Sequence, residues 1–306
     1  MRAYIIRRLL AMIPVVFGVV TIVFLIIHLT PGDPVEIMLG ETAAPALKEE
    51  LREELGLNKP LLEQYFIFIA RLFKGDLGKS IYTRKPVAQS IRERYGATAE
   101  LALSSMLLAI LIAVPLGVIA AYKKNTMVDQ GAMAASLLGV SMPSFWIGPL
   151  LILLFAIELQ WLPASGKDGI ESLVLPSVTL GAAMAAILSR LTRSTMIESL
   201  NEDYIITAKA KGLSERATLF KHALANALLP VVTVAGLQLG ALLGGAIITE
   251  TIFAWPGIGR LTIQAINARD YPLTQGCVLT IALSYVFINL IVDILYSVID
   301  PRIKYR

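Results

Sequence analysis

Six stretches of the chain contain no Asp, Glu, Lys or Arg, and each is long enough to form one membrane-spanning helix. They cover residues 9–32, 101–122, 130–157, 172–189, 222–249 and 271–292, with lengths of 24, 22, 28, 18, 28 and 22 residues. A helix needs about 20 apolar residues to cross a bilayer. One or two such stretches could form the core of a soluble protein, but six predict an all-α, polytopic membrane protein with six transmembrane helices.

The basic residues predict how these helices are oriented. Six spans put both termini on one side, and the segments on that side contain fourteen Lys and Arg residues, against three in the two short loops opposite. Because basic residues are enriched in cytoplasmic loops, we expect both termini in the cytoplasm. Residues 30–97 then lie outside, where their ten basic and ten acidic residues form a solvated segment.

The outer segment contains one strongly amphipathic stretch. Pro60 suits the first turn of a helix, and LLEQYFIFIARLF follows it. We expect this helix to lie on the membrane surface or to pack against the spans. A second helix is predicted from Pro86 to about Tyr95. The segment as a whole is either a structural lid or a docking surface for an external partner.

Prolines and small residues mark three of the spans. The third is interrupted by SMPSFW at 141–146, which predicts either a packed kink or a break that lines a water-filled path. Ser141 and Pro143 are therefore candidates for a translocation path. The fourth span is rich in small residues, which favours close packing inside a bundle. In the fifth, three glycines at four-residue spacing predict a helix-packing face, and they are Gly236, Gly240 and Gly244.

Three polar residues lie inside the last two spans. Gln238 faces away from the glycine face and is a candidate path residue, as is Asn289 in the sixth span. Asp293 lies one turn after Asn289. Ionisable residues inside a membrane are commonly functional, but Asp293 is near the cytoplasmic end, which also favours a structural bond to a neighbouring helix.

A charged, helix-forming stretch at 201–230 separates the fourth and fifth spans. Acidic residues open a short helix at about 202–211 and lysines close it, which complements the helix dipole. Gly212 is suited to a left-handed helix end, and Ser214 can cap a second helix. The apolar face of that second helix is expected to contain Ala217, Phe220, Leu224 and Ala227. The stretch predicts a compact corner that presents a surface to another protein.

Motifs for chemistry are missing from the sequence. GDLGKS at 75–80 lacks the first glycine that a phosphate-binding loop requires. Ser141 has no nucleophile-elbow context, and two histidines with one cysteine make no zinc motif. We therefore expect no catalytic residue, no metal site and no cofactor in this chain, and the modest positive charge reflects loop asymmetry rather than nucleic-acid binding.

Several motifs in the same order resemble one family. DYIITAKAKGL followed by HALANALLPVVTVAGLQLG is similar to the EAA loop of binding-protein-dependent ABC importers, in the form found in dipeptide and oligopeptide permeases. Further matches run through nearly the whole chain: LTPGDP, LGLNKPLLEQY, GDLGKS, SMPSFW, ETIFAWPGIGRL, RDYP and NLIVDILYSVIDPR. The positions of the motif's Glu-Ala-Ala hold Ile206, Thr207 and Ala208, and Pro230 comes eighteen residues after Gly212. Both departures resemble the peptide-permease version.

This resemblance implies a type I ABC importer permease fold with three parts. They are a peripheral transmembrane helix at 1–29, an extracytoplasmic loop subdomain at 30–97, and a five-helix core at 98–306 that includes a cytoplasmic coupling loop at 196–227. The chain would lie in a bacterial or archaeal plasma membrane beside a homologous second permease. A solute-binding protein would deliver substrate, and two ATPase subunits would bind ATP and Mg²⁺. The expected docking residues are Tyr204, Ala208, Lys209, Gly212 and Leu213.

The resemblance leaves the transported solute open. Dipeptides or oligopeptides fit best, and nickel or other peptide-like solutes such as glutathione are alternatives within the family. From a different class, an ion-coupled secondary transporter would predict paired discontinuous helices in inverted repeats, and no such repeat is visible. A structural membrane scaffold is the remaining alternative.

Overall fold

The computed structural model describes residues 2–29, 33–40 and 42–299 of the 306-residue chain. The described residues form helices and no strand. The first half contains α1 (Arg2–Leu29), α2 (Pro34–Leu39), α3 (Pro45–Leu55), α4 (Leu61–Phe73), α5 (Val87–Tyr122), α6 (Met127–Ser141), α7 (Ser144–Leu151) and the π-helical η1 (Ile152–Glu158). The second half contains α8 (Glu171–Leu200), α9 (Asp203–Ala210), α10 (Glu215–Ala217), the π-helical η2 (Thr218–Ala223), α11 (Leu224–Gly245), α12 (Ile247–Ile252), α13 (Ile258–Asn267) and α14 (Tyr271–Ile299).

Six segments are long and apolar enough to cross a membrane. Five are continuous helices, which lie within α1, α5, α8, the α10–α11 segment and α14. The sixth is a broken pair, α6 with α7 and η1, whose two halves are bent by 100°. The all-α prediction of six spans is confirmed, and the third span breaks where SMPSFW predicts it.

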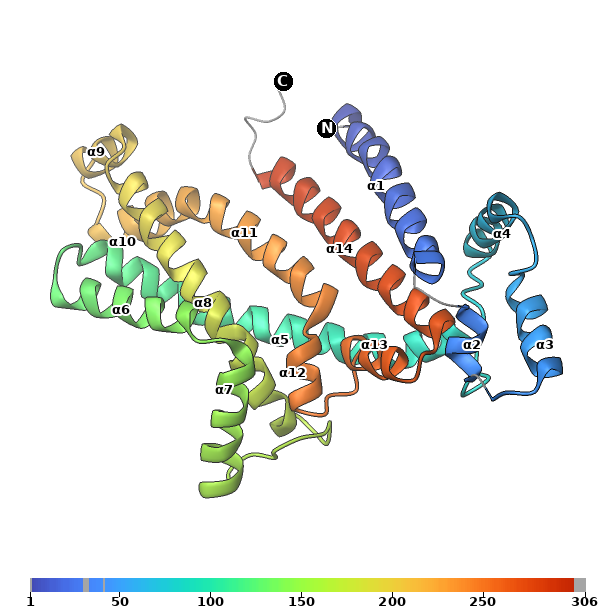
Figure 1. Cartoon of the computed structure of the whole chain (residues 1–306). Helices are drawn as coiled ribbons and strands as arrows, with labels where there is room; N and C mark the ends of the chain where they lie inside the picture. Colours follow the sequence, from blue (N-terminus) through green and yellow to red (C-terminus); the bar gives the residue numbers. More distant parts are fainter. Residues whose placement is uncertain (1, 30–32, 41, 300–306) are drawn as a thin grey trace.

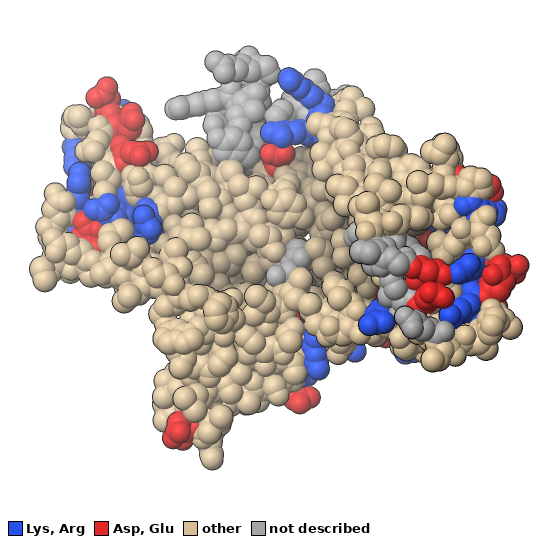
Figure 2. Space-filling view, in the orientation of Figure 1, with Lys and Arg blue, Asp and Glu red and all other residues tan. Residues whose placement is uncertain are grey.

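The charged residues lie mainly at the two ends of the bundle. In Figure 1, α9 and the first turns of α1 and last turns of α14 lie in the upper part, whereas α2, α12 and α13 lie lower. Figure 2 shows Lys, Arg, Asp and Glu around the edges of the molecule, on the α9 side, at the upper edge, on the α2–α3 side and at the lower edge, with a broad uncharged surface between them. This uncharged band is what the hydrocarbon core of a membrane requires.

Close packing of α5 against α8 forms the centre of the bundle. A Cβ added to Gly117 would lie 2.5 Å from Thr192 Cβ, and one added to Gly181 would lie 3.0 Å from the Ser105 carbonyl oxygen. The buried cluster around this contact is rich in alanine and includes Ala102, Met106, Ala109, Ala113, Met184, Ala185, Leu188, Val231 and Ala235. Small residues let helix backbones approach, so the close packing predicted for the fourth span is confirmed.

The helix α5 is longer than the sequence pattern predicts. Its 36 residues correspond to about 54 Å, against about 30 Å for a bilayer core. The separate helix expected from Pro86 to Tyr95 is therefore wrong, because those residues form the first turns of α5. The helix also crosses residue 97, where the outer subdomain is expected to end, and the three-part division of the chain stays a proposal.

The helices α11 and α14 meet at two of the three predicted packing glycines. A Cβ added to Gly236 would lie 2.2 Å from Val292 Cγ2, and one added to Gly240 would lie 3.3 Å from Tyr285 Cδ2. The third predicted packing glycine, Gly244, lies outside the part of the chain whose packing the structure describes.

We predict that Gly236→Ala lowers the thermal unfolding midpoint of the purified protein, because the new methyl group forces α11 away from Val292. Overpacking of this kind costs about 1–3 kcal/mol. The matched control is Gly18→Ala in the spanning helix α1, where an added Cβ meets nothing within 4 Å. The control should unfold at the wild-type temperature or above it, and equal midpoints for the two variants would contradict the packing role of Gly236.

Candidate functional site: a helical corner at the end of the bundle

The short helix α9 is anchored by one face. Ile205, which is 1% exposed, and Ala208 are buried. Ile205 belongs to a buried cluster that also contains Val118 and Ala121 of α5, Met196 of α8, and Ala223 and Ala227 at the start of the fifth span. This cluster joins α9 to three spanning helices.

The other faces of α9 are exposed. Tyr204, Lys209, Gly212 and Leu213 of the expected docking set lie at the surface, and so does Ile206. Ala208 differs from them because its side chain faces inward. The Tyr204 hydroxyl is hydrogen-bonded to Ser199 Oγ, and Ser199 in turn donates to the Ala223 carbonyl oxygen at 3.0 Å. The exposed ring is thus held against the ends of two spans.

Gly212 ends α9 in the left-handed conformation, with φ of +78°. Its N–H donates to the Lys209 carbonyl oxygen at 3.0 Å, and the Leu213 N–H donates to that of Ala208 at 3.3 Å. Ser214 Oγ then accepts the Ala217 N–H at 3.3 Å and caps the next helix. The predicted glycine corner and serine cap are both confirmed.

The helix after the corner contains an irregularity that the sequence does not reveal. Residues of η2 form π-helical turns, which contain more residues per turn than an α-helix. The expected apolar face is wrong at Phe220, which is 56% exposed, whereas Thr218 and Ala223 are buried. The wider turns shift the side chains that follow, so a 3.6-residue periodicity places Phe220 on the wrong face.

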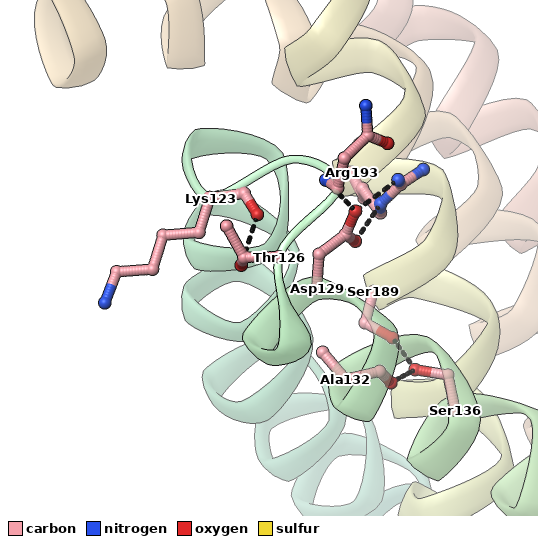
Figure 3. A network of polar contacts seen from close by, with 8 residues as sticks. Lys123, Thr126, Asp129, Ala132, Ser136, Ser189 and Arg193 are labelled. Atoms are coloured by element: carbon pink, nitrogen blue, oxygen red, sulfur yellow. Dashed lines mark hydrogen bonds and ion pairs between the residues drawn. The ribbon is translucent and has the colours of Figure 1, made fainter.

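A buried ion pair fixes the start of the broken span. Asp129, at the first turn of α6, accepts two hydrogen bonds from the guanidinium of Arg193 on α8, at 2.5 and 2.7 Å, and the Asn125 N–H at 2.9 Å. About two turns further along α6, Ser136 is hydrogen-bonded to Ser189 of α8 at 2.8 Å. Figure 3 shows these residues pointing toward one another between the two helices. This pair is not evident from the sequence, because Asp129 directly precedes a charge-free stretch, where an acidic residue normally marks a solvated helix end.

The four path candidates lie in three separate places. Ser141 and Pro143 are exposed at the corner between α6 and α7, and Ser141 Oγ donates to the Leu137 carbonyl oxygen at 2.8 Å. Gln238 Nε2 and Asn289 Oδ1 are buried on α11 and α14 without a hydrogen-bond partner among the described residues. The structure does not bring the four side chains into one cavity.

Asn289 lies in a cavity of about 650 Å³. Residues of α1 and α14 line most of it, including Arg8, Met12, Tyr285 and Asp293. At one end Arg8 forms an ion pair with Asp293 at 3.0 Å. The structural interpretation of Asp293, a bond to a neighbouring helix, is confirmed.

At the opposite end of the bundle, a buried carboxylate joins three helices. Glu250 of α12 is fully buried, accepts a hydrogen bond from Thr98 Oγ1 of α5 at 2.7 Å, and accepts the Arg260 N–H of α13 at 2.9 Å. Thr98 Oγ1 also accepts the Ile258 N–H at 2.8 Å. Burial raises the pKa of Glu250, and the hydrogen bonds oppose that rise. Gly257 is required beside this carboxylate, because an added Cβ would lie 2.2 Å from Glu250 Oε1.

Six membrane-crossing segments, one of them broken, and an anchored helical corner at one end define a membrane transport permease. Comparison with known families agrees. Residues 113–305 match the binding-protein-dependent transport system inner membrane component, and residues 1–102 match the N-terminal region of such membrane components. The chain belongs to this family, the multi-pass permease subunits of ABC importers in the inner membrane. Membership implies an ATPase, a binding protein and a second permease as partners.

Curated relatives match the chain over its whole length. The dipeptide transport system permease protein DppB of Alkalihalophilus pseudofirmus is 47% identical over all of both chains. The glutathione transport system permease protein GsiC of Escherichia coli O6:H1 is 45% identical over 99% of each chain. Among solved structures, a chain of the inward-facing MetNI methionine ABC transporter has a TM-score of 0.56 over 69% of this chain and 96% of its own, at 18% identity. That likeness supports the permease fold.

We predict that Ile205→Ala and Ile206→Ala have different effects on stability, although the residues are adjacent. Ile205 is 1% exposed and Ile206 is 63% exposed. Removing a buried isoleucine side chain costs about 2–5 kcal/mol, so Ile205→Ala should lower the thermal midpoint of the purified protein. Ile206→Ala should leave that midpoint within error of the wild type. Equal losses in both variants would show that Ile205 is not the anchor of α9.

Proposed function

We propose that this chain is the permease subunit of an importer for dipeptides or other short peptides. It forms half of the translocation path with a homologous second permease, and two ATPase subunits supply the energy. The corner at 202–213 docks one of these ATPases in the cytoplasm. Both termini of the chain lie on that same side, and residues 30–97 meet the solute-binding protein outside.

The observation that carries this proposal is the two-sided corner. On one face of α9, Ile205 is buried in a cluster with residues of α5, α8 and the start of the fifth span, and the other face presents Tyr204, Ile206 and Leu213 to the surface. Exposed apolar side chains on a short rigid helix suit the groove of a partner protein. Closure of the ATPase subunits around α9 therefore moves three spanning helices at once. Lys209 and Gly212 complete the proposed docking surface.

The proposed substrate class rests on relatives that match along the whole chain. One is named for dipeptides and the other for glutathione, and both solutes contain peptide amides and carboxylates. The path itself is proposed to pass the α6–α7 break at Ser141 and Pro143 and the unpaired amide of Gln238. Asn289 is a weaker path candidate because its cavity adjoins α1 rather than this break.

The substrate proposal is tested with the reconstituted importer and its cognate solute-binding protein. Binding to the solute-binding protein is first screened by calorimetry with dipeptides, longer peptides, glutathione and Ni²⁺. ATP-dependent uptake into proteoliposomes is then measured for every solute that binds. We expect uptake of dipeptides or of another short peptide. Uptake of Ni²⁺ without uptake of any peptide would show that the substrate is nickel and not a peptide. Ion-driven uptake that does not need ATP would overturn the importer mechanism.

We predict that Gly212→Val uncouples the ATPase from transport while the chain still inserts into the membrane. An added Cβ meets nothing within 4 Å at this position, so the cost comes from the backbone. The left-handed conformation costs about 1–2 kcal/mol for a non-glycine residue, and it is especially unfavourable for a β-branched residue. The measurement is substrate-stimulated ATP hydrolysis by the reconstituted importer.

The matched control for this substitution is Gly212→Asn. Asparagine tolerates the left-handed conformation better than other non-glycine residues, and it also adds a side chain to the docking surface. Coupling should survive in this variant and be lost with valine. Loss in both variants would indicate that the bare surface of Gly212, rather than its backbone conformation, is required. Full coupling in both would count against any role for this corner.

A further inference from the structure

The helix α4 has an apolar surface that the rest of the described chain does not cover. Only two of its residues, Glu63 and Arg71, are charged, and none of its thirteen residues is buried. Leu62, Phe66 and Phe73 are 73%, 66% and 89% exposed. Their spacing of four and seven residues places them on one face of the helix. Water is an unfavourable environment for such a face.

The neighbouring face of α4 packs against the first spanning helix. The Tyr65 hydroxyl is hydrogen-bonded to Thr21 Oγ1 at 2.6 Å, and the Tyr65 ring lies 5.1 Å from that of Phe24 and 6.2 Å from that of Phe17. Gln64 Oε1 is hydrogen-bonded to His28 Nε2 at 3.1 Å. These contacts place α4 beside the C-terminal half of α1, where Figure 1 also draws it.

These contacts also fix the depth of α4 relative to the membrane. The charge-free stretch that contains most of α1 covers residues 9–32, and α1 ends at Leu29. Thr21 and Phe17 precede Leu29 by eight and twelve residues, which correspond to about 12 and 18 Å along the helix. An amphipathic helix that lies in a membrane interface buries its apolar face about 5–10 Å into the boundary between headgroups and acyl chains. The contacts of Tyr65 with Thr21 and Phe17 lie at least this deep.

The part of α1 that contacts Tyr65 also has exposed apolar side chains. Phe17 and Ile22 of α1 are themselves exposed, at 57% and 64%, and the family places this span in the inner membrane. A water-soluble protein cannot reach a face below the headgroups, which excludes the solute-binding protein as its cover. Of the two charged residues of α4, Arg71 lies opposite this face and Glu63 lies at its edge. Glu63 forms an ion pair with Lys59 at 2.7 Å.

We propose that α4 is an interfacial helix whose face of Leu62, Phe66 and Phe73 inserts among the acyl chains of one leaflet. This is the outer leaflet in the orientation proposed above. The partner is lipid, and the contact attaches the segment between the first two spans to the bilayer surface. The inference rests on the depth of α4 beside α1 and is independent of the transported solute.

The test measures the surroundings of single side chains in the assembled importer, with partner subunits that lack cysteine, in phosphatidylcholine–phosphatidylglycerol nanodiscs. Nitroxide labels are attached to Phe66→Cys and, separately, to Leu62→Cys. The native Cys277 is buried, so wild type labelled in the same way is the blank. Power-saturation spectroscopy then compares collisions with oxygen, which concentrates in acyl chains, and with a water-soluble nickel chelate. The matched control on the same helix is Glu63→Cys.

We expect labels at positions 62 and 66 to collide several-fold more with oxygen than with the chelate, and the label at position 63 to show the reverse. Free access of the chelate to positions 62 and 66 would overturn the proposal, because that face would lie in water. Poor access of both reagents would also overturn it, since the second permease would then cover the face. Normal peptide uptake by the labelled importer would leave the transport function standing in either case.

Discussion

Backbone hydrogen bonding inside a hydrocarbon layer is the constraint on which the rest of this structure depends. A helix satisfies its own amides, so every break must be compensated from outside the helix. At the third span, Met142 still donates to the Leu138 carbonyl oxygen before the chain turns at Pro143. After the fifth span, Glu250 and Thr98 accept the first free N–H groups of α13. The first N–H groups of a helix have no acceptor within the helix. The side chains of Glu250 and Thr98 supply those acceptors for α13.

Local signals in the sequence predicted the elements, and long-range pairs account for what it missed. Apolar runs predicted the six spans, and glycine and serine predicted the cap at Gly212 and the next helix start. Asp129, Glu250 and Asp270 all border charge-free stretches, where acidic residues normally mark a solvated helix end. All three are nevertheless buried. Each is hydrogen-bonded to a distant partner: Arg193, Thr98 and Ser80 lie 64, 152 and 190 residues away in the chain. A single sequence contains no signal for such pairs.

The two ends of the molecule are built on different principles. At the α9 end, a small apolar contact centred on Ile205 joins the corner to three spans, and apolar contacts have no preferred direction. A tilt of α9 can therefore keep this apolar contact, although it changes the hydrogen bond between Tyr204 and Ser199. At the other end, Glu250, Thr98 and Trp255 form directional hydrogen bonds, the last to the Ala97 carbonyl oxygen at 2.8 Å. If an ATPase docks at the α9 end as proposed, a push there would pivot the bundle about the hydrogen-bonded end.

The π-helical turns of η2 give the corner an adjustable orientation. Each such turn contains one residue more than an α-helical turn, so η2 is equivalent to a single-residue insertion between α9 and the fifth span. Loss or gain of one residue there would rotate the corner about the helix axis by about 100°. The cluster below the corner and the packing of α11 could stay as they are. In this chain, such a change would turn the proposed docking corner to a new angle without rebuilding the membrane-spanning part.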